Sequence, residues 1–184
     1  MSEEEKQLDR FESILEEGLV RICTGEGMMS EIMTSPDIDQ RWEEFISEYV
    51  ADGVRNYNSY PDASLGFAAY LGMAVAHHWD GNWQAHRLDS YTSYFGDRGF
   101  DNMDDHIAAD IRHLTKAETD KVRKALQNCT AATEGLIRHE AIEPQTAVGF
   151  YALVRCFSVF FRIGVSIELY RLGYKKEPVN NFIS

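Results

Sequence analysis

The sequence predicts an all-α protein, a single-domain helical bundle of about six to seven helices around a long, mostly buried C-terminal helix. Apolar residues recur three and four positions apart in every long segment. No stretch shows the alternation, rich in valine and threonine, that is typical of strands. Residues 144–173 are apolar on almost every side, which is typical of a helix buried on most of its faces. The chain has 184 residues and is 44% hydrophobic, so we expect one domain over residues 1–184 with one substantial core.

Two helices are predicted in the first third of the chain. The first spans residues 4–23, where acidic residues gather at the start, apolar residues follow at helical spacing, and Gly25 ends the helix. The second begins after Ser35, which is followed by a first-turn proline, and ends near Gly53. Methionine fills irregular gaps, so the methionine-rich segment between the two helices is predicted to pack as a flexible flap.

The third predicted helix, over residues 61–79, is loaded with alanine and glycine. Small residues allow two helix backbones to approach closely. We therefore expect this helix to lie against the long C-terminal one, whose Gly149 and Gly164 offer the same close approach.

Three shorter patterns lie between the third helix and the last. Residues 83–94 and 102–114 are each predicted to form a helix. A further helix runs to about residue 142 and begins with the capping box Thr115-Lys116-Ala117-Glu118. Pro144 then interrupts the chain before the long final helix.

The overall charge limits the classes of partner. The formal net charge is -12, which argues against nucleic-acid binding, because lysine and arginine supply most of that affinity. Binding to a membrane surface is disfavoured for the same reason. The apolar run over residues 147–170 imitates a membrane span, but Arg155 and Arg162 near its middle would be costly in a bilayer. A buried helix of a soluble protein is the better interpretation.

The cysteines indicate a reducing compartment. Cys23, Cys129 and Cys156 are odd in number, far apart in the sequence and set among apolar neighbours, so we expect buried free thiols. The first residues are acidic and lack the basic start and apolar core of a signal peptide. A cytoplasmic location is therefore predicted.

The most informative polar feature is a stripe on the last helix. Arg155, Ser158, Arg162 and Ser166 fall within about 60° of one another at 100° per residue. In one interpretation the arginines form internal ion pairs, with Asp80, Asp110 and Glu140 as the expected partners. In the other, arginines and serines hold a small anionic ligand between aromatic walls, namely Tyr70, Trp79, Trp83 and Tyr151.

A second polar feature is the histidine-rich run that begins at His77 and ends at His86. One of His77 and His78 must face inward or lie along an interface, where it either packs and caps the helix or contributes to a site. Combined with the stripe, this run gives the predicted ligand-binding set: His78, Trp79, Asp80, Trp83, Tyr151, Arg155 and Arg162.

No metal, cofactor or catalytic residue is predicted. His106, Asp110 and His113 share one face, but the two histidines lie two turns apart, about 10 Å along the axis, so one helix cannot place both on one ion. The chain contains no G-x-S-x-G motif, no cysteine in a polar setting and no glycine-rich phosphate loop.

The first functional hypothesis is a non-enzymatic interaction module that forms a homodimer. The homodimer is predicted because a glycine-rich stretch contains several aromatic residues to which core positions are hard to assign: Tyr91, Tyr94, Phe95 and Phe100. The first alternative is a protein, enzymatic or not, that binds a small anionic ligand in an enclosed cavity touching His78 and Arg162. The second is an acidic inhibitor or immunity-type protein that covers a basic protein partner, which requires acidic residues concentrated on one face.

Overall fold

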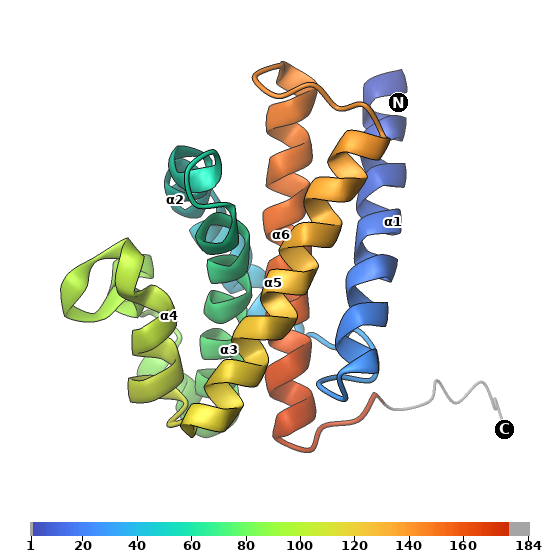
Figure 1. Cartoon of the computed structure of the whole chain (residues 1–184). Helices are drawn as coiled ribbons and strands as arrows, with labels where there is room; N and C mark the ends of the chain where they lie inside the picture. The colour runs from blue at the N-terminus through green and yellow to red at the C-terminus, as the bar shows by residue number, and fades with distance from the viewer. Residues whose placement is uncertain (1, 177–184) are drawn as a thin grey trace, which may run out of the picture.

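The computed structural model describes residues 2–176, and these fold into a helical bundle without strands (Figure 1). The long helices are α1 (Glu3–Gly25), α2 (Pro36–Tyr57), α3 (Pro61–His86), α5 (Lys116–His139) and α6 (Ala147–Arg171). Shorter turns connect α3 to α5: η1 (Tyr91–Arg98), η2 (Phe100–Asn102), α4 (Met103–Asp105) and η3 (His106–Ile111). The α6 helix packs against α1, α2 and α3 and is mostly buried, so the predicted fold class is confirmed.

Two N-terminal helices begin as their sequences predict. The Ser2 hydroxyl accepts a hydrogen bond from the backbone N–H of Glu5, and Ser35 does the same for Ile38, which satisfies N–H groups that a helix leaves free. The α2 helix runs past Gly53 to Tyr57, so its predicted end was wrong. Gly53 is needed for packing, because a Cβ there would lie 2.5 Å from a ring carbon of Phe157.

The predicted contact between the third helix and the last is confirmed. A Cβ added to Gly164 would lie 1.8 Å from the carbonyl oxygen of Ala69, and one added to Gly72 would lie 2.2 Å from that of Phe161. The backbones of α3 and α6 therefore touch directly. Gly149 does not take part, because its nearest neighbour is the carbonyl oxygen of Glu143 in the loop before α6.

The region between α3 and α5 differs most from its prediction. The α3 helix does not end at Trp79 but continues to His86 across a kink at Asn82 (φ -156°, ψ 78°). The Asn82 side chain accepts a hydrogen bond from the backbone N–H of Ala85, so it caps the turn that follows. The predicted helix over 102–114 is a short α4 followed by a π-helical turn, in which the N–H of Arg112 donates to the carbonyl of Ile107.

The methionine segment between α1 and α2 packs into the core. Met28, Met29 and Met33 are all buried. The backbone N–H of Met33 donates to the Ser166 hydroxyl at 2.9 Å, which fixes this segment to α6. The three thiols are buried and free, as predicted, and Cys23 Sγ of α1 lies 3.7 Å from Cys129 Sγ of α5.

Among residues 2–176, α6 is the one helix long and apolar enough to cross a membrane by length and composition. More than half of its most apolar window is buried against other helices. This is the pattern of a core helix in a soluble protein.

Candidate functional site

The predicted ligand-binding residues face different neighbours. Arg155 and Arg162 point toward α1, whereas His78 contacts His86 and Tyr94. Trp79 packs on Tyr174, and the hydroxyl of Tyr174 donates to Asp80 at 2.7 Å. Trp83 packs partly buried against the core, and Tyr151 is exposed near the start of α6. The predicted set is thus spread over several surroundings.

The arginine stripe forms ion pairs with α1. Arg155 Nη1 lies 2.7 Å from Asp9 Oδ1, and Arg162 donates from Nε and Nη2 to Glu16 Oε2 at 3.1 and 2.6 Å. Glu12 lies between them, 3.7 Å from each guanidinium. The expected partners Asp80, Asp110 and Glu140 were wrong, because periodicity gives the direction of a side chain but not the helix that it meets.

The two serines of the stripe also have partners within the bundle. Ser158 accepts a hydrogen bond from Trp42 Nε1 of α2 at 3.0 Å. Ser166 binds the backbone of Met33, as described above. The four stripe residues are therefore occupied in joining α6 to its neighbours, which favours the ion-pair interpretation over the anion pocket.

Replacing Arg162 by methionine is expected to lower the free energy of unfolding by about 1 to 2 kcal/mol. The side chain of Arg162 is 25% exposed, so water weakens its attraction to Glu16, and the loss is smaller than for a fully buried pair. Urea unfolding at low and high salt measures it, and the loss should shrink as salt screens the pair. Arg21→Met is the control, because the Arg21–Glu17 pair is 75% exposed on both sides. A gain in stability for Arg162→Met would instead support an empty anion site.

A buried ion cluster, which the sequence did not reveal, lies at the C-terminal end of α6. Glu168 is fully buried, and its Oε1 accepts hydrogen bonds from Arg112 Nε and Nη2 at 3.0 and 2.7 Å. His77 Nδ1 lies 2.8 Å from Glu168 Oε2, and Arg171 donates to both carboxylate oxygens. Glu168 is the single acidic residue of α6, and that isolation in an apolar helix is the signal that could have identified it.

The partners of Glu168 keep it ionised. Burial alone raises the pKa of this carboxyl group, since the charged form loses its water. Hydrogen bonds from His77 and Arg171, with the charge of Arg112, outweigh that effect and bring the pKa down to about 2. With His77 bonded here, His77 faces α6, and His78 lies on the other side of the same turn beside Tyr94. The cluster is an internal ion network rather than an open site.

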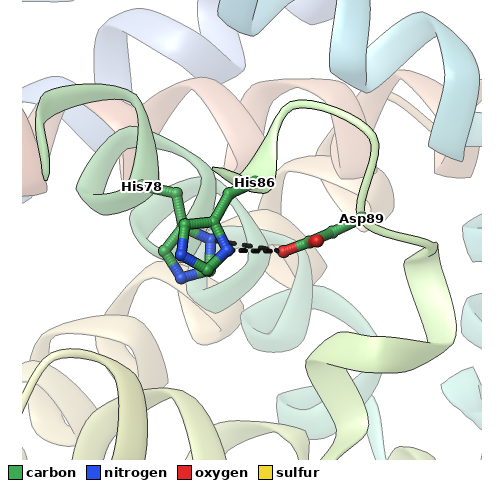
Figure 2. Close-up of side chains that lie close together, drawn as sticks. All are labelled: His78, His86 and Asp89. Atoms are coloured by element: carbon green, nitrogen blue, oxygen red, sulfur yellow. Dashed lines mark hydrogen bonds and ion pairs between the residues drawn. The ribbon is translucent and has the colours of Figure 1, made fainter. Parts of the chain in front are cut away.

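His78, His86 and Asp89 form a second cluster, shown in Figure 2. The rings of His78 and His86 are stacked, with centroids 3.7 Å apart and planes 8° from parallel. His86 Nδ1 lies 2.8 Å from Asp89 Oδ2, and His78 Nδ1 lies 3.4 Å from the Tyr94 hydroxyl. Burial, together with the neighbouring His86, lowers the pKa of His78 to about 4, so this imidazole is neutral at physiological pH.

A buried arginine holds the backbone beneath this cluster. Arg41 of α2 donates to the carbonyl oxygen of Asp89 and pairs with Glu44, and its guanidinium lies 4.2 Å from the centroid of the Phe45 ring. The contact fixes the loop that carries Asp89 against α2. Neither Arg41 nor Asp89 was among the predicted site residues.

The other histidine group remains incomplete as a site. His106 Nδ1 lies 2.9 Å from Asp110 Oδ2. His113 comes after the π-helical turn, at φ 53°, so it does not continue the helical face that it was predicted to share.

An open apolar groove lies where the C-terminal ends of α2 and α5 meet the start of α6. Its volume is about 170 Å³, and most of its lining is apolar: Val54, Tyr57, Ile137, Ile142, Pro144, Phe150, Ala152 and Leu153. Phe150, on the groove wall, is 42% exposed, and Tyr151 beside it is 55% exposed. Their ring centroids lie 5.4 Å apart in an edge-to-face arrangement, so the two exposed rings lie together beside the groove that Phe150 lines.

The aromatic residues that motivated the predicted homodimer have places inside the fold. Tyr91 and Tyr94 are buried, and Phe95 and Phe100 pack partly buried against the core. The argument that these residues lack core positions was wrong, because irregular turns can bury aromatic side chains in the same way that a helix can. The homodimer itself stays a prediction.

Comparison of the chain with models of protein families, with curated proteins and with solved structures finds no match to any of them.

Proposed function

We propose that this chain is a non-enzymatic helical interaction module that acts as a homodimer, with two copies meeting at the apolar groove. The observation that supports it is the pairing of exposed rings with a hollow on one face: the Phe150–Tyr151 aromatic pair beside the groove between α2, α5 and α6. A two-fold interface joins one patch to itself, so a patch with exposed rings beside a hollow can place those rings in the hollow of its own copy.

The dimensions of the groove suit an aromatic side chain. A cavity of about 150 Å³ takes a benzene ring, so a groove of about 170 Å³ has room for the phenol ring of Tyr151 from a second copy. Tyrosine is common among the residues that dominate the energy of protein interfaces, because its ring is large and loses little conformational freedom.

The charges near the groove also favour a second copy over a strongly basic partner. Glu134 and Arg138 of α5 act in opposite directions on the pKa of Tyr57 in the groove wall, so charges of both signs lie near this residue. A patch that carries charges of both signs can bring its positive residues opposite the negative residues of its two-fold copy. The net charge of -12 acts over a longer distance, and physiological salt screens it beyond about 8 Å.

The ligand-binding alternative has less support. Arg155 and Arg162 are paired with α1, and the serines beside them are hydrogen-bonded within the bundle. An anion would have to displace these carboxylates before it could bind the stripe.

Sedimentation equilibrium over a range up to hundreds of micromolar tests the homodimer. The parent chain of 21.0 kDa is expected to show a concentration-dependent rise toward twice that mass. Tyr151→Ser should weaken dimerisation at least about thirtyfold, since loss of a central interface aromatic costs about 2 kcal/mol or more. Leu88→Ser is the matched control, because Leu88 is the most exposed large apolar residue among residues 2–176 and lies away from the groove, after α3. A parent that stays monomeric throughout, or a Tyr151→Ser variant that dimerises as well as the parent, would refute the proposal.

A further inference from the structure

The kink at Asn82 brings two histidines together that a straight helix would separate. Eight residues of regular helix rise about 12 Å, which would be the axial distance between His78 and His86. With Asn82 out of helical conformation, the chain turns back and the two rings stack at 3.7 Å. The turn after α3 then carries Asp89 to the same place, so that all three side chains in Figure 2 converge.

We infer that His78, His86 and Asp89 form a binding site for one divalent transition-metal ion with the ligand preference of Zn²⁺. Two imidazole nitrogens and one carboxylate oxygen are ligands that Zn²⁺ and Co²⁺ accept, whereas Ca²⁺ and Mg²⁺ require mainly oxygen ligands. The ligand atoms of the three residues lie within 4.8 Å of one another. This site is distinct from the His106–Asp110–His113 set on which the prediction of no metal was based.

The observed distances are close to those that a metal would impose. Bonds of about 2.1 Å in a tetrahedral arrangement place neighbouring ligand atoms about 3.4 Å apart. Asp89 Oδ2 lies 2.8 Å from His86 Nδ1 and 4.0 Å from His78 Nδ1, on either side of that value. Binding therefore requires Asp89 Oδ2 to shift by about half an ångström relative to each of these nitrogens, and the two rings must also tilt out of their parallel stack so that their lone pairs converge on one point.

The surroundings allow an ion to enter and leave a coordination position open. The side chains of His78, His86 and Asp89 are 13%, 36% and 30% exposed, so the cluster is accessible from one side. Three protein ligands leave the fourth position of a tetrahedral ion for water, as in zinc sites that bind an exchangeable ligand. The nearby charge of Arg41 is paired with Glu44, and its hydrogen bond to the Asp89 carbonyl holds the loop in place.

The test is a titration of chelator-treated protein with Co²⁺ and Zn²⁺ alone. Calorimetry should give one bound ion per chain, and the visible absorption of Co²⁺ should show nitrogen and oxygen ligation at a tetrahedral site. His86→Asn and Asp89→Asn should each weaken binding at least about tenfold, because changes even in groups that only support metal ligands cost 10- to 100-fold. Both residues are partly exposed, so these variants keep the core intact, and thermal melts verify that they are folded.

His106→Asn and Asp110→Asn are the matched controls. They alter another hydrogen-bonded His–Asp pair, 2.9 Å apart, which lacks a third ligand. They should leave the affinity for Co²⁺ and Zn²⁺ unchanged. The inference fails if folded parent protein binds neither ion at millimolar concentration, or if His86→Asn binds as tightly as His106→Asn.

Discussion

Replacing Glu168 by glutamine is expected to lower the free energy of unfolding by about 3 to 5 kcal/mol. Arg112, with a side chain 1% exposed, would then keep its charge inside the protein without the carboxylate that neutralises it. An unpaired buried charge is among the most costly defects in a folded protein. Urea unfolding followed by circular dichroism measures the difference.

Two further variants separate the charge from the packing. Arg171→Met should cost much less, about 1 to 2 kcal/mol, because Arg171 is about a third exposed and Arg112 and His77 still bind Glu168. The double variant Arg112→Met with Glu168→Met should recover part of the loss of Glu168→Gln, because it removes both buried charges together. A double variant less stable than Glu168→Gln would show that packing, not charge, explains the loss.

The same carboxylate predicts a dependence on pH. The pKa of Glu168 is about 2 in the folded chain, against an ordinary value of 4.5. The stability that ionised Glu168 contributes is present above pH 4.5 and is lost as the pH falls toward 2. The difference in unfolding free energy between the parent and Glu168→Gln should therefore narrow by about 3 kcal/mol over this range. A difference independent of pH would contradict this assignment.

Replacing Gly164 by alanine should also be strongly destabilising, by about 1 to 3 kcal/mol or more. The new Cβ would lie 1.8 Å from the backbone oxygen of Ala69, and no side chain can rotate to relieve a contact with the backbone. The α3 and α6 helices would have to move apart, which loosens the centre of the bundle. Thermal unfolding of the variant measures the loss.

Gly18→Ala is the matched control, because Gly18 lies inside α1 and nothing stands within 4 Å of its added Cβ. Alanine favours a helix by up to about 1 kcal/mol over glycine, so this variant should be slightly stabilised. Gly72→Ala should lower the free energy of unfolding less in the Gly164→Ala background than in the parent chain, because α3 and α6 have already moved apart there. Equal effects of Gly18→Ala and Gly164→Ala would show that the close backbone contact is not required.

Local sequence predicted most of the long helices because their signals are local. The predicted capping residues Ser35 and Thr115 accept hydrogen bonds from N–H groups three positions later, and that geometry depends on neighbouring residues alone. The α3–α6 contact was predictable for a related reason, since glycine is unfavourable inside a helix and is kept there where two backbones approach closely, as at Gly72 and Gly164. The same signals were less informative over residues 91–113, where short 3₁₀ and π turns are held by contacts distant in sequence, such as those of Tyr91 with Asp52 and Arg112 with Glu168.

The candidate site was harder to predict, because its residues meet only after the chain has turned. Arg162 was identified because it is a charged residue in an apolar helix. Its partner Glu16 is 146 residues away, and neither segment contains a signal that predicts the pairing. His78 was named without Asp89, because a helix pattern could not show the kink at Asn82 that turns the chain back. Glu168 was overlooked although a lone carboxylate in an apolar helix is as informative as a lone arginine.

The central position of α6 has a consequence for the order in which the protein is made. It is the last of these helices to leave the ribosome, yet α1, α2 and α3 each pack against it. Until residues 147–171 have been synthesised, the apolar faces of α1 and α3 lack their main partner, and Arg112 lacks the carboxylate of Glu168. Folding therefore has to be completed late, after α6 has emerged. For most of its synthesis the growing chain exposes apolar surface that is prone to aggregation.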